Sequence, residues 1–222
     1  MKKLFITVAF VAAAMFAQAQ LFVGGNIGFT TQSGTSKVEG NGVTVEQDAP
    51  KAFTFEFGPS VGFMFNDNMG VGIDLGFNFT KETEKDYDDE VTLTYTTKTT
   101  ELAFAPYFRY VFAEVDNFKF YADAKISYST SKPKVTVEGD GMSVSMDGAK
   151  TTKFGIGVVP GMAYMLTDNI SMNCQLNILS LGYKTTKVTN EGNGVTATDK
   201  TNEFGLGINN ATPITIGFFY TF

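Results

Sequence analysis

Apolar and polar residues alternate along much of the chain with a repeat of two residues. In the stretch 213–222, Phe218, Tyr220 and Phe222 share one face while Thr221 falls on the other. Successive side chains of a β-strand point to opposite faces, so this alternation predicts a strand with one apolar face. The strand ends on an aromatic side chain. That ending suits a barrel whose last strand closes against its first and leaves no edge.

Seven earlier stretches alternate in the same way. The eight predicted strands cover residues 20–31, 53–65, 70–79, 102–112, 118–128, 154–166, 170–178 and 213–222. The connections between them alternate strictly between long and short, so the short ones and both ends of the folded region lie together. This arrangement predicts an all-β fold: an eight-stranded antiparallel up-and-down transmembrane β-barrel. The long connections, such as 81–97, are expected to be loops. Apolar and polar residues also alternate on either side of the repeated Gly-rich tips, which predicts that two of the hairpins continue as β-ribbons.

Prolines recur about every 50 residues in the even-numbered strands, at Pro59, Pro106, Pro160 and Pro213. Proline has no N–H to donate to a neighbouring strand, so each is expected to leave a bulge or a missing bond in the sheet.

The N-terminus has the three parts of a secretory signal peptide. Lys2 and Lys3 are positive, residues 4–16 are apolar, and Ala17-Gln18-Ala19 is a small-x-small cleavage site. Residues 1–19 are therefore predicted to be a cleaved signal peptide, and residues 20–222 to form one barrel domain. No stretch of the mature region approaches the roughly 20 apolar residues of a membrane-spanning helix.

Charge and residue usage exclude several classes of function. The formal charge is −6 for the whole chain and −8 without the predicted signal peptide, which argues against nucleic-acid binding. The chain has no His, so hydrolytic chemistry lacks its usual general base. The single Cys174 falls on an apolar face, where a thiol is inert. We therefore expect no enzyme activity, no cofactor, no catalytic residue and no metal site.

Aromatic residues on the apolar faces cluster near the strand ends, which is typical of the interfacial girdles of a membrane barrel. A soluble β-sheet protein with an apolar core would show the same alternation. The girdle interpretation is favoured because every strand repeats the pattern, and nothing else in the chain remains to cover so many Phe residues.

Six charged residues fall on the opposite, inward faces. The predicted polar network of the lumen consists of Glu56, Asp74 and Asp123 with Arg109, Lys119 and Lys125. Unpaired charges inside a narrow barrel are costly, so three acids and three bases predict a paired plug in two layers. Counting from the short turns places Asp74 level with Arg109 and Asp123, and Glu56 and Lys125 higher. An acid/base site is the alternative.

With its signal peptide, its strand alternation and its terminal Phe218, Tyr220 and Phe222, the chain resembles the small OmpA/OmpX-like, porin-family outer-membrane barrels of Gram-negative bacteria. In such proteins an aromatic-ended last strand is the signal read by the barrel assembly machinery. The resemblance implies this role for Phe218, Tyr220 and Phe222, and a location in the outer membrane.

Three functions remain open from the sequence. The first is a structural or cell-surface interaction role, with a lumen filled by polar side chains. The alternative is a narrow pore or transporter for a small or hydrophobic solute, and the third is a soluble exported barrel that binds a ligand inside. The expected partners are outer-membrane lipid and lipopolysaccharide, the assembly machinery during biogenesis, and an extracellular partner at the loops. The protein is expected to be a monomer.

Overall fold

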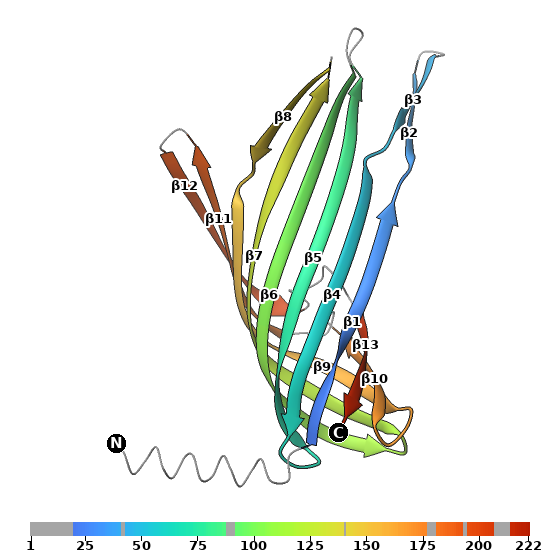
Figure 1. The fold of residues 1–222 in the computed structure, drawn as a ribbon, viewed down its shortest axis with the longest axis vertical. Coiled ribbons are helices and arrows are strands. Elements are labelled where there is room, and N and C mark those ends of the chain that lie inside the picture. The colour runs from blue at the N-terminus through green and yellow to red at the C-terminus, as the bar shows by residue number, and fades with distance from the viewer. Residues whose placement is uncertain are drawn as a thin grey trace.

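A computed structural model describes residues 20–40, 43–87, 92–139, 141–176, 181–192, 195–206 and 214–222. The predicted signal peptide lies outside the described residues, as does Pro213. All described strand pairings are antiparallel (Figure 1). Within these ranges no helix has the length and apolar character needed to cross a membrane.

Eight strands pair in a closed ring. In ring order they are β1 (Gln20–Gln32), β4 (Lys51–Met64), β5 (Met69–Tyr87), β6 (Thr92–Val115), β7 (Phe118–Gly139), β9 (Lys150–Met165), β10 (Ile170–Leu176) and β13 (Ile214–Thr221). Each pairs with the next, and β13 pairs back onto β1. These eight strands lie where the alternation predicted strands, and their closure forms a barrel without a free edge at that level.

Among the described residues the sheet that contains this ring has eleven strands, so eight was too low a count. The additional strands are β8 (Met142–Asp147), β11 (Leu181–Gly192) and β12 (Val195–Leu206), and a separate two-stranded sheet joins β2 (Thr35–Gly40) to β3 (Val43–Asp48). The predicted ribbons are thus present, at β2–β3 and β7–β8. The prediction that 81–97 forms a loop was wrong, because β5 continues to Tyr87 and β6 begins at Thr92.

The two ends of the barrel differ. Three short connections, 65–68, 116–117 and 166–169, lie at one end beside the C-terminus, and we call this the short-turn end (Figure 1). Asp116 lies in the tightest of these turns with a φ of 51°, which an Asp tolerates in a turn. At the other, ribbon end the strands run far beyond the closed ring. With 24 and 22 residues, β6 and β7 are about twice as long as a barrel strand needs to be to cross a membrane.

The apolar faces of the strands point outward. Phe29 is 78% exposed and Phe222 is 65% exposed, although both are large hydrophobic residues. Several rings pair on this surface near the short-turn end: Phe63 with Phe65, Phe118 with Tyr164, and Tyr220 with Phe222, at centroid distances of 5.1, 4.8 and 4.9 Å. An outer surface this apolar is that of a membrane barrel and excludes a sandwich of two sheets packed through these Phe faces.

The prolines leave gaps in the pairing without shifting its register. Between β4 and β5 the pairing passes from Phe57↔Phe77 to Ser60↔Asp74, skipping Pro59. Between β6 and β7 it skips Pro106 in the same way. A missing bond, rather than a bulge, is therefore the effect of these two prolines; the one register shift in β6–β7 lies further along, between Val111 and Ala113.

The seam between the first and last strands is short. β13 pairs with Phe22–Gly25 of β1, whereas β4 pairs with the whole of β1. Gly25 ends the described seam with a φ of +150°, and a Cβ on it would meet the carbonyl oxygen of Gly58. Only glycine fits this close approach of backbones.

Candidate functional site

An ion pair joins two neighbouring strands inside the barrel. Arg109 of β6 lies directly opposite Asp123 of β7. Its Nε donates to Oδ1 of Asp123 over 2.8 Å and its Nη2 donates to Oδ2 over 2.9 Å. Asp123 is fully buried and Arg109 is 7% exposed. A bidentate pair of this kind fixes both side chains in one geometry and satisfies charges that water does not reach.

Three aromatic rings enclose the Arg109 guanidinium. Its central carbon lies 3.8 Å from the ring centroid of Tyr121, 5.3 Å from that of Tyr107 and 5.8 Å from that of Phe22. All three rings are at least 95% buried, and Tyr121 is only 1% exposed. The rings stabilise the cation through their π faces and fill the space around it. We call Arg109, Asp123, Tyr107, Tyr121 and Phe22 together the central layer.

Glycines on facing strands make room for the tyrosines. A Cβ on Gly161 would lie 2.5 Å from Cζ of Tyr121, and one on Gly72 would collide with the Tyr107 hydroxyl. Each glycine is directly opposite its tyrosine on the neighbouring strand, so the absence of a side chain there lets the large ring lie over the glycine.

A second ion pair lies toward the ribbon end. Lys125 Nζ donates to Oδ2 of Asp74 over 2.7 Å and to Oε1 of Gln175 over 3.0 Å. Gln175 Nε2 in turn donates to Oδ2 of Asp123 over 3.0 Å. Asp74, Lys125, Gln175, Asp123 and Arg109 thus form one continuous chain of hydrogen bonds through the barrel. Connected networks of this kind rigidify a buried polar core.

The two predicted layers exist, but their membership differs from the prediction. Asp74 pairs with Lys125 of the upper layer rather than lying level with Arg109. Strand stagger is the reason: on β6, Asp74 is opposite Ala105 and Lys125 is opposite Tyr107, whereas Arg109 is further toward the short turns.

Glu56 and Lys119, the remaining two predicted members, lie apart from this chain of hydrogen bonds. Glu56 accepts a hydrogen bond from Asn78 Nδ2 over 3.3 Å, higher in the lumen. Lys119 is opposite Glu114 beside the turn 116–117, and its Nζ lies 3.6 Å from the Glu114 carboxylate. Lys119 lines the lower part of the lumen with Arg109 and Tyr121, but its acidic partner is the partly exposed Glu114 beside the turn.

Sequence reasoning missed the neutral members of the network. Gln175, Tyr107 and Tyr121 fall on inward faces by their spacing, but nothing in their type distinguishes them from solvated residues. Lys153 and Glu101 also pair inside, over 2.9 Å, above the Lys125 layer. Asn173 is 5% exposed, and its Oδ1 is buried without a hydrogen-bond partner.

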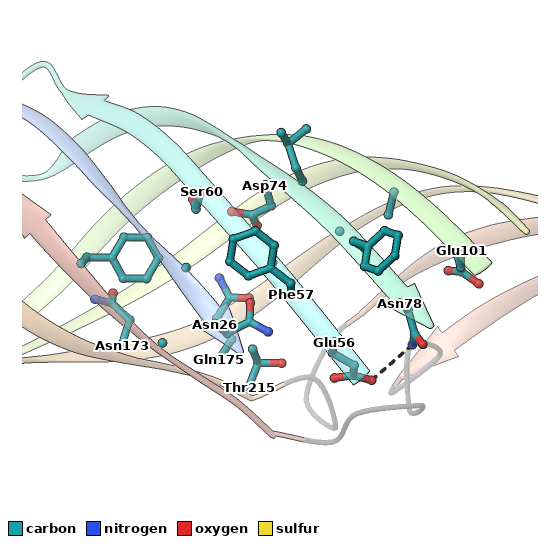
Figure 2. A pocket seen from close by; sticks show the side chains of 18 residues that line it. Asn26, Glu56, Phe57, Ser60, Asp74, Asn78, Glu101, Asn173, Gln175 and Thr215 are labelled. Carbon is teal, nitrogen blue, oxygen red and sulfur yellow. Dashed lines mark hydrogen bonds between the residues drawn. The ribbon is translucent and has the colours of Figure 1, made fainter. Parts of the chain in front are cut away.

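The central layer separates two cavities. The upper one has a volume of about 340 Å³ and is lined by acidic and amide side chains, among them Glu56, Asp74 and Asn78 (Figure 2). The lower one, of about 240 Å³, opens at the short-turn end and is lined by Arg109 and Tyr121. Asn173 and Phe219 border both cavities. Among the described residues no three His, Cys, Asp or Glu side chains are grouped to hold a metal ion.

Comparisons with known proteins agree with this architecture. The family model for the outer membrane protein beta-barrel domain matches residues 4–210. The chain belongs to this family. It is a small outer-membrane β-barrel protein, and its place is the outer membrane. An uncharacterized protein of Haemophilus influenzae is 30% identical to this barrel protein over 177 residues, covering 79% of this chain and 88% of that protein.

Solved structures of outer-membrane proteins are similar at low identity. OprG from Pseudomonas aeruginosa is 17% identical with a TM-score of 0.47, covering 92% of this barrel protein and 95% of that chain. Ail of Yersinia pestis is 12% identical with a TM-score of 0.35, covering 92% of this chain and 98% of that chain.

Proposed function

We propose that this barrel protein is a monomeric, non-conducting outer-membrane protein that presents its β-ribbons at the cell surface for structural or interaction roles. The observation that carries the proposal is the burial of the central layer. A water-filled path past Arg109 and Asp123 would leave these side chains exposed, yet Asp123 is 0% and Tyr121 is 1% exposed. The interior at this level is a packed polar core, as in the narrowest barrels.

The ribbon end supports a role outside the membrane. Only about ten residues of each strand are needed to cross the hydrocarbon layer. The remaining residues of β5, β6 and β7 form a polar, Thr-rich sheet that continues beyond the apolar surface (Figure 1). In barrels of this family short turns face the periplasm and longer segments face outward. We therefore place the short-turn end in the periplasm and the ribbon end outside the cell.

Planar-bilayer conductance tests the sealed lumen. We expect no steady conductance from the wild-type protein. Removing the pair in Arg109→Ala/Asp123→Ala, and one enclosing ring in Tyr121→Ala, joins the two cavities and is expected to produce measurable ion flow. The Glu114→Gln variant changes one charge outside the central layer and serves as the control. Steady conductance of the wild-type protein would refute the proposal.

A narrow transporter for a small solute is the second candidate function. The observation in its favour is the pair of cavities, 340 and 240 Å³, that share Asn173 and Phe219 at their boundary. Transport would require the Tyr121 and Arg109 side chains to leave their places. Uptake of small solutes by proteoliposomes that hold the wild-type barrel would favour this alternative.

Two further parts of the proposal concern biogenesis and chemistry. Phe218, Tyr220 and Phe222 are proposed to be read by the barrel assembly machinery; all three are more than 40% exposed on the outer face of β13.

The protein is also proposed to have no enzyme activity. The lack of His supports this, as does the fact that the lumen carboxylates of Asp74 and Asp123 are held in ion pairs rather than beside a nucleophile that they could activate.

A further inference from the structure

Three lysines lie side by side on neighbouring strands at the ribbon end. Lys81 of β5 is directly opposite Lys98 of β6, and Lys98 is directly opposite Lys134 of β7. All three are exposed. We call these residues the lysine row. Lys134 is also opposite Asp147 of β8, whereas Lys81 and Lys98 meet only Phe or Lys residues within the pairings of this row. Like charges directly opposite each other destabilise a sheet, so the Lys81–Lys98–Lys134 arrangement is one that the fold alone does not favour.

The lysine row belongs to the outer face of the sheet. Lys81 is separated from Phe77 and Phe79 by even steps along β5, and the same alternation places Lys98 with Leu102 and Lys134 with Tyr128. Leu102 is 55% exposed and Tyr128 is 47% exposed. The row therefore begins within two to six residues of the apolar surface, on the same face and toward the ribbon end. This is the level at which headgroups meet a membrane barrel.

Charge is sorted between the two faces at this level. By the same alternation and register, the charged residues on the outer face are nearly all basic: Lys51, Lys81, Lys85, Lys98, Lys132, Lys134, Lys150, Lys187 and Lys200, with Glu138 and Asp147 as the acids. The inner face carries the acids Glu82, Glu84, Asp86, Glu101, Asp199 and Glu203, of which Glu101 pairs with Lys153 and Glu203 with Lys184. A net negative chain thus turns a positive surface toward its surroundings.

We propose that the lysine row binds the phosphate groups of a phosphorylated glycolipid in the outer leaflet. A phosphate group carries close to two negative charges, and its oxygen atoms can accept hydrogen bonds from several ammonium groups at once. The bound phosphate cancels the repulsion among Lys81, Lys98 and Lys134, while the acyl chains lie on the apolar surface beside Leu102 and Tyr128. The inference rests on the orientation in the proposed function, which puts the ribbon end outside the cell.

The test uses the full-length mature protein refolded in neutral detergent, with lipid A as the probe and its dephosphorylated form as the lipid control. The row variant is Lys81→Gln/Lys98→Gln/Lys134→Gln. Its matched control, Lys51→Gln/Lys85→Gln/Lys150→Gln, removes the same charge from the same face at positions that are opposite threonines in the described pairings. Binding is measured by titration of mixed micelles, and thermal stability by the gel shift of the folded barrel.

We expect the wild-type protein to bind lipid A in preference to the dephosphorylated lipid, and the row variant to lose affinity on the order of a hundredfold. The control variant should lose far less. The stability effect should change sign: without lipid A the row variant is more stable than the wild type because repulsion is removed, and with lipid A it is less stable.

Equal loss in both variants would show that binding depends on net charge alone, and it would overturn the proposal. Unchanged binding in the row variant would overturn it as well. Neither result concerns the conductance measurement, so a failure of this site is distinguishable from a failure of the sealed-barrel proposal.

Discussion

Arg109 donates two hydrogen bonds, of 2.8 and 2.9 Å, to Asp123 on the adjacent strand inside the barrel. In the part of the chain that the structure describes, the ion pairs of these two side chains join them only to each other. Breaking the pair therefore leaves a buried, uncompensated charge, whereas removing both members leaves a packing defect and the neutral Gln175 Nε2 without its Asp123 acceptor.

The first prediction is that Arg109→Met lowers the free energy of unfolding by about 3–5 kcal/mol. The double variant Arg109→Met/Asp123→Leu should recover most of this loss, because no charge is then left without its partner. Urea unfolding of the refolded protein in detergent, followed by circular dichroism, measures both. Lys119→Gln, at the partly exposed pair beside the short turn, should change stability by less than about 1 kcal/mol. A double variant as unstable as the single one would contradict the pairing.

The second prediction concerns the space for Tyr121. Gly161→Ala places a methyl group against the tyrosine ring, so it should destabilise the barrel by about 1–3 kcal/mol. Gly28→Ala is the matched control, since its nearest neighbour would be Glu56 Oε2 at 3.6 Å, an ordinary contact. The control should stay within about 1 kcal/mol of the wild type. The same unfolding measurement compares them; equal stability of the two variants would argue against the tyrosine lying across the lumen.

A third prediction follows from the ribbon formed by β7 and β8. Lys132 Nζ lies 2.6 Å from Oδ2 of Asp147, and this hydrogen bond and charge hold the pKa of the Asp147 carboxyl below its usual range. A lowered folded-state pKa means that the pair stabilises the ribbon above the unfolded pKa of about 4, and that this contribution is lost as the pH falls through the folded pKa. Titration of the Asp147 carboxyl by NMR should give a low pKa that returns to the usual range in Lys132→Gln.

The fourth prediction addresses orientation. Gly141 is exposed in the turn between β7 and β8, with a φ of +74° and no atom within 4 Å of the position of a Cβ. An epitope inserted after Gly141 should be tolerated and detected by antibody on intact cells. An epitope inserted at Asp116, in the opposite turn, should be detected only after the outer membrane is permeabilised. The reverse pattern would refute the orientation.

The fifth prediction separates assembly from stability. Phe222 donates its N–H to the Leu21 carbonyl oxygen over 2.8 Å, a backbone contact that Phe222→Ala preserves. The variant should therefore refold in detergent nearly as well as the wild type, while the amount assembled in the outer membrane of cells falls severalfold. Phe29→Ala removes an exposed ring from β1, beyond the part of β1 that pairs with the last strand, and is the control. Equal assembly of all three proteins would remove the proposed role of Phe222.

The sequence predicted the membrane-crossing part of the fold better than the rest. Where one face of a strand meets lipid, alternation is strict, and the eight stretches marked by it form the closed ring. Beyond Phe79 and before Leu102 both faces of the sheet are polar, so the alternation disappears although the strands continue. The length of the strands at the ribbon end could therefore not be predicted from the sequence.

The candidate site divides in the same way. The inward position of Arg109 and Asp123 follows from parity along each strand, and their partnership was within reach of the sequence. The pairing of Asp74 with Lys125 depends on strand stagger. The alternation of inward and outward positions along one strand gives no information about that stagger. The lysine row depends on it entirely, because Lys81, Lys98 and Lys134 are far apart in the chain and adjacent only through register.

The short seam between β1 and β13 also determines when the barrel can close during folding. Its partners, such as Val23 and Tyr220, are separated by about 200 residues of chain, so the ring cannot close until the segment that holds Tyr220 has been synthesised. Contacts of such long range form slowly. Each new copy must therefore travel from synthesis to membrane as an open chain, dependent on chaperones for as long as its Phe-rich faces remain uncovered.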